Sequence, residues 1–277
     1  MRPTELRKAE QAFPKNEVKL EVLESPLPLP AREEWVCRIC GWHAAQTRPE
    51  ECELCHAGPG AFAREHDLES SADAAVETTP LAEGLWRIRN GFGWGHACYL
   101  LEKPAGAVLI DCPDVFTPKL VDFLNSKGGV RQVLYCHHHF LGAGQRARQL
   151  FGAETILHEG DRHDRIVTVP IDRWVADEEV AINGGGDEPV RGLLIGGHTP
   201  GSTFFHFQGK LFTGDAFSGW NGPLGWFYMD LASVRKARAR IADLPIRAIY
   251  SSCGHTTKGA SRQILGRSGQ GGSEPNA

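Results

Sequence analysis

The sequence predicts an α+β protein with two β-sheets flanked by helices, preceded by a small metal-binding unit. From residue 80 onward, short runs of β-forming residues alternate irregularly with helical runs, and this order favours two sheets over one doubly wound sheet. Ahead of that region, two Cys-x-x-Cys pairs lie close together in the sequence. This spacing is typical of the ligands of a four-thiolate metal site.

Length, charge and hydropathy exclude several classes of protein. The 277 residues suffice for one large domain or two unequal ones. A formal net charge of −4 argues against a surface for nucleic acid or for anionic lipid. We find no apolar run of about 20 residues, the length that a transmembrane helix needs, and no apolar centre of a signal peptide near Met1. We therefore expect a soluble, cytoplasmic protein without nucleic-acid or membrane partners.

Composition divides the chain into five segments. Residues 1–33 are polar and end in a proline-rich run, so we expect an extended leader. Residues 34–63 hold the cysteine pairs and form the first domain. Residues 64–79 are charged and then rich in Ser, Ala and Thr, which is typical of a linker. The second domain is expected over residues 80–265, and a disordered tail over 266–277.

Within the second domain, the expected elements follow from short apolar runs and turn residues. Strands are expected at 85–89, 97–101 and 107–111, with a glycine-rich turn after the first. Thr117 before Pro118 is typical of a helix start, so a helix is expected over 118–126. Next we expect a strand at 130–135, a helix at 145–151 and a strand at 155–157. Four further β-type runs are expected at 174–182, 193–195, 203–207 and 210–213. A basic helix at 232–241 and a last strand at 248–252 complete the domain.

The two Cys-x-x-C pairs predict a four-sulfur metal site. Each pair can form a tight turn, or knuckle, and two knuckles together offer tetrahedral ligation by Cys37, Cys40, Cys52 and Cys55. Such a small unit buries little apolar surface, so the metal is expected to supply much of its folding energy. In a reducing compartment, metal ligation explains these pairs better than disulfides do.

Neighbouring residues make this unit resemble the short rubredoxin-like domain of rubrerythrins. The residues that carry the resemblance are Trp35, Cys40-Gly41-Trp42, Pro49-Glu50 and Phe62. The resemblance implies iron that cycles between the ferric and ferrous states. A structural zinc ribbon is the alternative, because the ligand set alone does not separate the two metals.

The second domain is organised around an apolar run that ends in His137-His138-His139 and a glycine-bearing turn. A strand that delivers imidazoles to the loop at its carboxyl end is a common start of a metal site. Because side chains alternate along a strand, we expect the first and third histidines on one side and His138 on the other, in a packing role. Three more candidate residues follow short apolar runs near glycines, namely His198, Asp215 and His255.

With these motifs, residues 80 to about 258 are similar to the metallo-β-lactamase superfamily. The matching motifs are Val108-Leu109-Ile110-Asp111, the His-x-His of 137 and 139, the His-Thr-Pro-Gly-Ser of 198–202, the Phe-Thr-Gly-Asp of 212–215 and Gly254-His255. The resemblance implies an αββα sandwich with its metal site at one edge of the two sheets. It also implies that a first metal is held by His137, His139 and His198, that Asp215 bridges, and that His255 serves a second metal.

The sequence departs from that family at the ligands of the second metal. The usual His-x-His-x-Asp-His motif has Leu141 and Gly142 at its last two positions, and neither side chain can bind a metal. The second site keeps only Asp215 and His255. We therefore predict one metal, iron or zinc, with an open position for substrate and with the ligands His137, His139, His198 and Asp215.

Aromatic residues directly follow Asp215 and are expected to overhang the metal. Residues 217–220 and 226–228 either shape an apolar substrate pocket or pack as an ordinary loop. Cys136 and Cys253 are expected near the site and are interpreted as buried, inert thiols.

Three functional hypotheses follow. The leading one is a non-haem iron oxidoreductase in which an external reductase supplies electrons to the rubredoxin-like iron, which passes them to a mononuclear iron that activates dioxygen, nitric oxide or peroxide. Its candidate catalytic residues are Asp215 and His255, the latter as proton donor. The alternatives are a single-zinc ester or thioester hydrolase with a structural zinc ribbon, and a non-catalytic sensor or binding protein. The expected partners are the electron donor and a small-molecule substrate, and we allow for a homo-oligomer.

Overall fold

The computed structural model describes residues 34–45, 47–69, 76–89, 93–183, 188–219, 224–254 and 256–258. The expected leader and tail lie outside these ranges, as do two residues of interest, Trp220 and His255. None of the helices in the described ranges combines the length and the apolar character that a membrane span requires.

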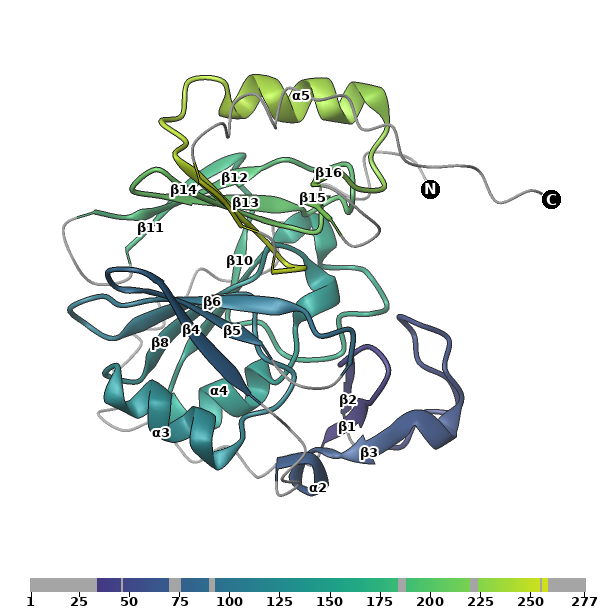
Figure 1. Cartoon of the computed structure of the whole chain (residues 1–277). Helices are drawn as coiled ribbons and strands as arrows, with labels where there is room; N and C mark the ends of the chain where they lie inside the picture. Colours follow the sequence, from purple (N-terminus) through teal and green to yellow (C-terminus); the bar gives the residue numbers. More distant parts are fainter. Residues whose placement is uncertain are drawn as a thin grey trace, which may run out of the picture.

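Two facing β-sheets form the centre of the fold (Figure 1). The first sheet has seven strands in the spatial order β10 (Arg173–Val175), β9 (Glu154–His158), β8 (Val130–Leu134), β7 (Ala107–Ile110), β6 (Ala97–Leu101), β5 (Leu85–Arg89) and β4 (Glu77–Ala82). The second has six strands in the order β11 (Glu179–Ile182), β12 (Val190–Leu194), β13 (Thr203–Phe207), β14 (Lys210–Gly214), β17 (Ala248–Ser251) and β18 (Thr256–Lys258). A two-stranded sheet of β15 (Phe217–Ser218) and β16 (Gly225–Trp226) follows β14.

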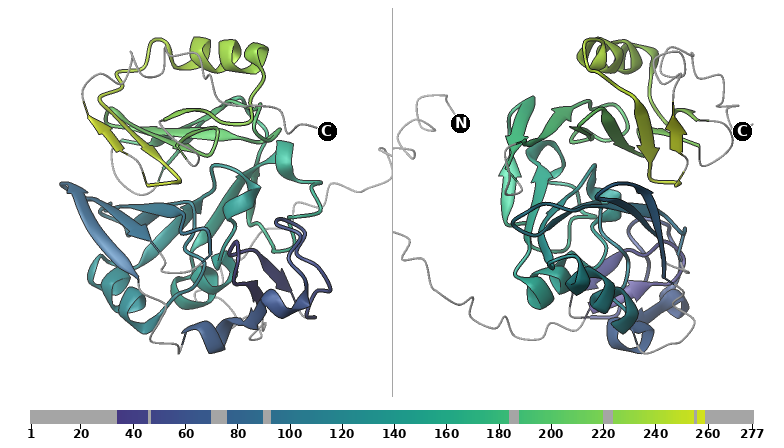
Figure 2. Two further views of the ribbon diagram at one scale, coloured as in Figure 1. Left: turned by 45° about the vertical axis from the view of Figure 1, so that its right-hand side comes forward. Right: turned by 60° about the vertical axis from the view of Figure 1, so that its left-hand side comes forward.

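Helices cover the outer faces of both sheets. Figures 1 and 2 show α3 (Pro118–Ser126) and α4 (Gly144–Phe151) on the first sheet and α5 (Leu231–Ile241) on the second. The order of layers is therefore helix, sheet, sheet, helix. The α+β sandwich expected from the sequence is confirmed by this arrangement.

Three apolar cores separate the layers. One lies between the first sheet and its helices, where Leu120 and Leu124 of α3 are buried. The second fills the space between the sheets and includes Tyr99 and Phe212. The third packs α5 on the second sheet through Val234, Ala237 and Ile241. Strands β6 and β7 are buried along their whole length, because the first sheet is covered on both faces.

Local sequence explains where the helices begin. The Thr117 hydroxyl accepts a hydrogen bond from the Leu120 N–H at the start of α3, and Pro118 takes the first helical position. Asp230 performs the same capping role for α5 by accepting from the Ser233 N–H at 2.8 Å. Side-chain capping by Thr117 and Asp230 therefore explains where α3 and α5 begin.

The cysteine unit is a separate three-stranded sheet beside the sandwich. Its order is β2 (His43–Ala45), β1 (Glu34–Cys37) and β3 (Phe62–Arg64), with a 3-10 turn at Pro59–Ala61 and the short helix α2 (Glu65–Glu69). Trp42 Nε1 donates to the Ile166 carbonyl at 3.0 Å. The Thr168 hydroxyl donates to the His43 carbonyl at 2.6 Å. These bonds hold the cysteine unit against the loop that precedes β10.

Three expectations about elements differ from the structure. The expected linker at 64–79 contains α2 and the first residues of β4, while its middle lies outside the described ranges. The run expected at 174–182 is two strands in different sheets, because Ala176-Asp177-Glu178 carry the chain from one sheet to the other. The strand expected at 130–135 ends at Leu134, and the histidines follow it in a turn. The division into domains itself stays a prediction.

Candidate metal centres

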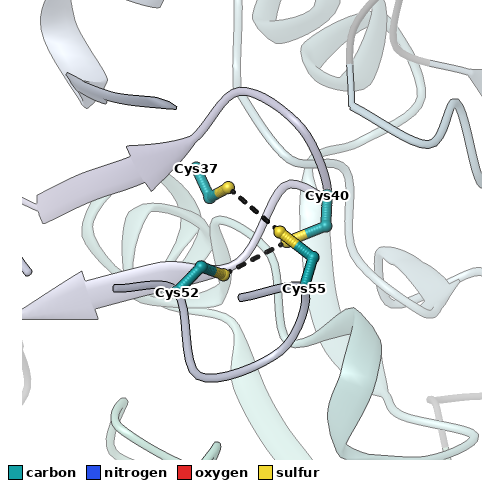
Figure 3. Close-up of side chains that lie close together, drawn as sticks. All are labelled: Cys37, Cys40, Cys52 and Cys55. Carbon is teal, nitrogen blue, oxygen red and sulfur yellow. Dashed lines mark hydrogen bonds between the residues drawn. The ribbon is translucent and has the colours of Figure 1, made fainter. Parts of the chain in front are cut away.

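The four predicted cysteines converge on one point. Figure 3 shows their side chains pointing toward one another from two turns of the chain. The sulfur atoms of Cys37 and Cys55 lie 3.7 Å apart, and those of Cys40 and Cys52 lie 3.5 Å apart. Tetrahedral ligation with metal–sulfur bonds of about 2.3 Å requires sulfur atoms about 3.7 Å apart. The donor set therefore fits one tetrahedral metal ion.

The surroundings of the cysteines exclude water. Three of them are buried and the fourth is half-buried, within a cluster that includes Trp42 and Phe62. Hydrogen bonds from Cys40 and Cys52 lower the pKa of the Cys37 thiol, whereas hydrogen bonds with Cys37 and Cys52 raise the pKa of Cys40.

The histidine site lies where β8, β12 and β14 end. The structure brings together His137, His139, His198 and Asp215, whose ligand atoms all lie within 4.8 Å of one another. Asp215 Oδ2 is 3.5 Å from His137 Nε2 and 4.0 Å from His198 Nε2. Ligand atoms around one tetrahedral metal with bonds of about 2.0 Å would be about 3.3 Å apart.

Unpartnered nitrogens support metal ligation at this site. Among the described residues, Nε2 of His137 and Nε2 of His198 are buried without a hydrogen-bond partner. A buried polar atom without a partner costs about 1–3 kcal/mol, and a metal ion would satisfy it. Burial is the main cause that lowers the pKa of His139 to about 2 and that of His198 to about 4, so both imidazoles are neutral and can ligate at pH 7.

The route by which His139 reaches the site differs from the prediction. His137 is extended, with φ −169° and ψ 175°, and it precedes a 3-10 turn at His138–Phe140. The tight turn, rather than strand alternation, places the rings of His137 and His139 4.6 Å apart. The two rings meet as expected, but strand alternation is not the cause, because the chain leaves the sheet before it reaches them.

The structure also explains why positions 141 and 142 provide no metal ligand. Leu141 is buried in the apolar core between the first sheet and its helices. Gly142 has φ +49°, and a Cβ there would lie 2.7 Å from the Pro113 carbonyl oxygen and 2.9 Å from that of Cys112. No side chain fits at this position without moving backbone. His255, the remaining predicted residue, lies outside the described ranges.

A carboxylate that the sequence did not single out joins the two histidine loops. Asp161 accepts hydrogen bonds from the backbone N–H of His138 at 3.2 Å and of Gly201 at 2.7 Å, and from the Thr199 hydroxyl at 3.1 Å. The His138 ring nitrogen Nδ1 lies 2.9 Å from the same carboxylate. No motif marks this residue in the sequence, since it lies in an ordinary polar turn. His138 thus packs beside the site, as expected.

Two further contacts fix the ends of the strands that carry ligands. Asp111, at the end of β7, accepts a hydrogen bond from the Cys136 N–H at 2.8 Å, directly before His137. The Ser252 hydroxyl donates to Asp215. Gly214 has φ +52°, and a Cβ there would lie 2.6 Å from Cys136 Cβ, which explains the glycine before Asp215.

A cavity of about 640 Å³ opens beside the histidine site. The part formed by the sandwich is lined by the candidate ligands His139, His198 and Asp215 and by Trp94, Arg165, Ile166, Phe227 and Tyr228. The second knuckle of the cysteine unit lines the cavity through Glu53, Leu54 and His56. The cavity therefore reaches from the histidine site to the knuckle that carries Cys52 and Cys55.

Comparisons with known proteins agree with this architecture. No family model matches the sequence. The hydroxyacylglutathione hydrolase of Anaeromyxobacter dehalogenans is 30% identical over 131 residues, which cover 46% of this chain and 48% of that protein. The chain thus spans about half the length of this relative.

Solved structures resemble the sandwich at low sequence identity. A metallo-β-lactamase from Erythrobacter litoralis gives a TM-score of 0.55 at 21% identity, covering 71% of this chain and 95% of that one. One from Pontibacter korlensis gives 0.54 at 17%, covering 69% and 96%. A flavo di-iron protein from Thermotoga maritima gives 0.51 at 14%, covering 70% and 61%. The chain therefore has the fold of the metallo-β-lactamase superfamily, preceded by a four-cysteine knuckle with the geometry of a metal site.

Proposed function

We propose that the protein is a metal-dependent oxidoreductase in which an iron centre at Cys37, Cys40, Cys52 and Cys55 passes electrons to a single metal in the sandwich. The ligands of that metal are His137, His139, His198 and Asp215. Iron in such a site supplies an open coordination position at which a small oxidant, namely dioxygen, nitric oxide or peroxide, can be reduced. An external reductase is the source of electrons.

The observation that carries this proposal is that the cavity beside the histidine site is also lined by the knuckle of the cysteine unit. Residues between and beside Cys52 and Cys55 line the same space as three ligands of the histidine site. A purely structural zinc unit has no need to lie there, whereas an electron-transfer centre must lie close to the metal that it reduces. The likeness to a flavo di-iron protein is compatible with a redox role for the fold.

The protein's own residues supply the other requirements. Asp161 and Asp111 hold the ligand-bearing loops, so the imidazoles are in place before a metal binds. The rings of Phe227 and Tyr228 lie beside His198 and give the cavity an apolar lining there. His255 is our candidate proton donor, and Asp215 serves both as ligand and as acceptor of the Ser252 hydrogen bond.

A metallohydrolase is the second candidate, and one observation favours it. The relative with 30% identity is a hydroxyacylglutathione hydrolase, so a thioester of that kind is the substrate class to test. Against it, Leu141 and Gly142 remove ligands that a two-metal hydrolase uses to clamp its substrate.

Metal analysis and one variant test the proposal. We expect about two iron ions per full-length chain purified without added metal, and a visible thiolate-to-iron band that bleaches on reduction. Cys40→Ser should abolish turnover driven by a reductase while the histidine site keeps its metal. Zinc at both sites, with thioester hydrolysis that needs no reductant, would replace this proposal with the hydrolase. Tight ligand binding without any turnover would indicate a sensor.

A further inference from the structure

The cavity is far larger than a small oxidant requires. A diatomic molecule needs about the 30 Å³ that one water occupies in the liquid, whereas the cavity measures about 640 Å³. Sites for organic ligands and cofactors have volumes of about 300–1,000 Å³. The size of the cavity therefore matches an organic molecule in addition to the oxidant.

The side of the cavity formed by the sandwich presents aromatic rings. The Phe227 ring lies 6.0 Å from the His198 ring, and the Tyr228 ring lies 6.5 Å from it with 24° between the planes. Trp94 is 42% exposed and Tyr228 is 76% exposed. Tyr228 also has a left-handed backbone, with φ +49°, which is strained for a residue other than glycine. Exposed rings and stored strain at the mouth of a metal site are typical of ligand binding.

The cysteine unit supplies the opposite side. Leu54 lies between Cys52 and Cys55, packs against the cysteine cluster and faces the cavity. Ile166 of the sandwich packs against the same cluster, and its carbonyl oxygen accepts the bond from Trp42. The apolar wall therefore continues from one unit to the other.

Polar side chains at the rim contact one another. Arg165 of the sandwich forms an ion pair with Glu53 of the cysteine unit at 3.2 Å, and His56 Nδ1 lies 2.6 Å from Glu51 Oε1. These rim groups are exposed and contribute little to binding, so apolar contact selects the body of a ligand. The polar groups that converge at the inner end are the predicted metal ligands.

We propose that this cavity binds an organic substrate with a flat, apolar body and an oxygen, nitrogen or sulfur donor at one end, and that the cysteine unit forms one wall of the binding site. The donor end reaches the metal of the histidine site, and the body lies between Leu54 and Trp94. This inference rests on the metal site of the proposed function, but it does not depend on which metal is bound or on a redox reaction.

Two hydroxamates test the proposal, because this head group chelates both ferric iron and zinc. 2-Naphthohydroxamate carries a flat apolar body, while acetohydroxamate offers the same head group with a methyl group only. Titration of the metal-loaded, full-length protein is followed by calorimetry and tryptophan fluorescence. We expect the naphthyl compound to bind at least about ten-fold more tightly, since ring contacts contribute about 0.5–1.5 kcal/mol each beyond burial.

Variants on both walls separate this proposal from others. Trp94→Ala and Leu54→Ala should each weaken 2-naphthohydroxamate about five-fold and leave acetohydroxamate unchanged. Leu231→Ala, a matched change at a residue that is 60% exposed on α5, should alter neither. The metal content of Leu54→Ala verifies that the cysteine site is intact. Trp94→Phe keeps an aromatic ring and should retain most of the preference for 2-naphthohydroxamate over acetohydroxamate.

Two results would overturn the proposal. Equal affinities for the two hydroxamates would show that the cavity does not recognise an apolar body. A preference that survives Leu54→Ala in full would show that the cysteine unit is no part of the site. Zinc at both centres together with the expected preference would refute the redox function and support the substrate site, so the two failures are distinguishable.

Discussion

Replacement of Asp161 by Asn should weaken metal binding at the histidine site and leave the cysteine site intact. The carboxylate has a fully buried side chain and joins the turn that carries His137 and His139 to the loop that carries His198. Oδ1 accepts from the Gly201 N–H, and Oδ2 accepts from the His138 N–H and from Thr199. Asn keeps the shape of the side chain but provides one acceptor oxygen in place of two.

The structure sets the magnitude of the loss. Whichever oxygen becomes an amide NH₂, at least one backbone N–H of the loops loses a buried acceptor, at about 1–3 kcal/mol. Loss of the contact between the carboxylate and the His138 ring nitrogen Nδ1 removes a second buried hydrogen bond, at about 1 kcal/mol. We expect the free energy of unfolding to fall by about 2–4 kcal/mol. Metal affinity should fall about 10–100-fold, the usual effect of removing a group that orients a ligand.

Competition against a chromophoric chelator measures the affinity, and urea unfolding measures the stability. Asp172→Asn is the matched control, because Asp172 accepts from the Thr155 N–H at 2.9 Å and from its hydroxyl at 2.8 Å but touches neither histidine loop. It should lose stability and keep its metal affinity. Unchanged affinity in Asp161→Asn, or an equal loss in Asp172→Asn, would refute the reasoning.

Three further predictions concern other parts of the chain. Gly142→Asp should not restore a second metal, which metal stoichiometry measures. It should destabilise the protein by about 2–4 kcal/mol in urea unfolding, because the new Cβ would contact the Pro113 carbonyl oxygen. Burial lowers the pKa of His43, but the bond to Glu34 outweighs burial and raises this pKa to about 9. The protonated His43 therefore stabilises the folded state fully below pH 6.5, and the free energy of unfolding should fall by about 3 kcal/mol as the pH rises through 9. His43→Gln should remove this slope in pH-dependent unfolding, and a persisting slope would contradict the assignment. Thr117→Ala should cost about 1 kcal/mol in thermal unfolding through loss of the cap of α3, whereas a neutral effect would show that Pro118 alone starts the helix.

The sequence was sufficient for the parts of the site that depend on local pattern. Cysteine spacing predicted the cluster around Cys37, and the position of polar residues after strands predicted that His198 and Asp215 would meet His137. The turn that carries His139 was missed, because three histidines after a strand read equally well as its continuation. Asp161 was missed because its role arises only when two distant loops pack on it, and a lone aspartate in a polar turn carries no signal.

The loss of the second metal ligands and the docking of the cysteine unit involve the same loop. The carbonyl groups of Cys112 and Pro113 close the space beside Gly142, and the Pro113 carbonyl accepts the Ala143 N–H at 2.9 Å. On the other side of this loop, His43 Nε2 donates to the Asp114 carbonyl at 2.8 Å. A side chain at 142 would displace this loop, which also carries the carbonyl group that anchors the cysteine unit. The glycine that removes a metal ligand therefore also keeps the loop in the position to which the cysteine unit binds.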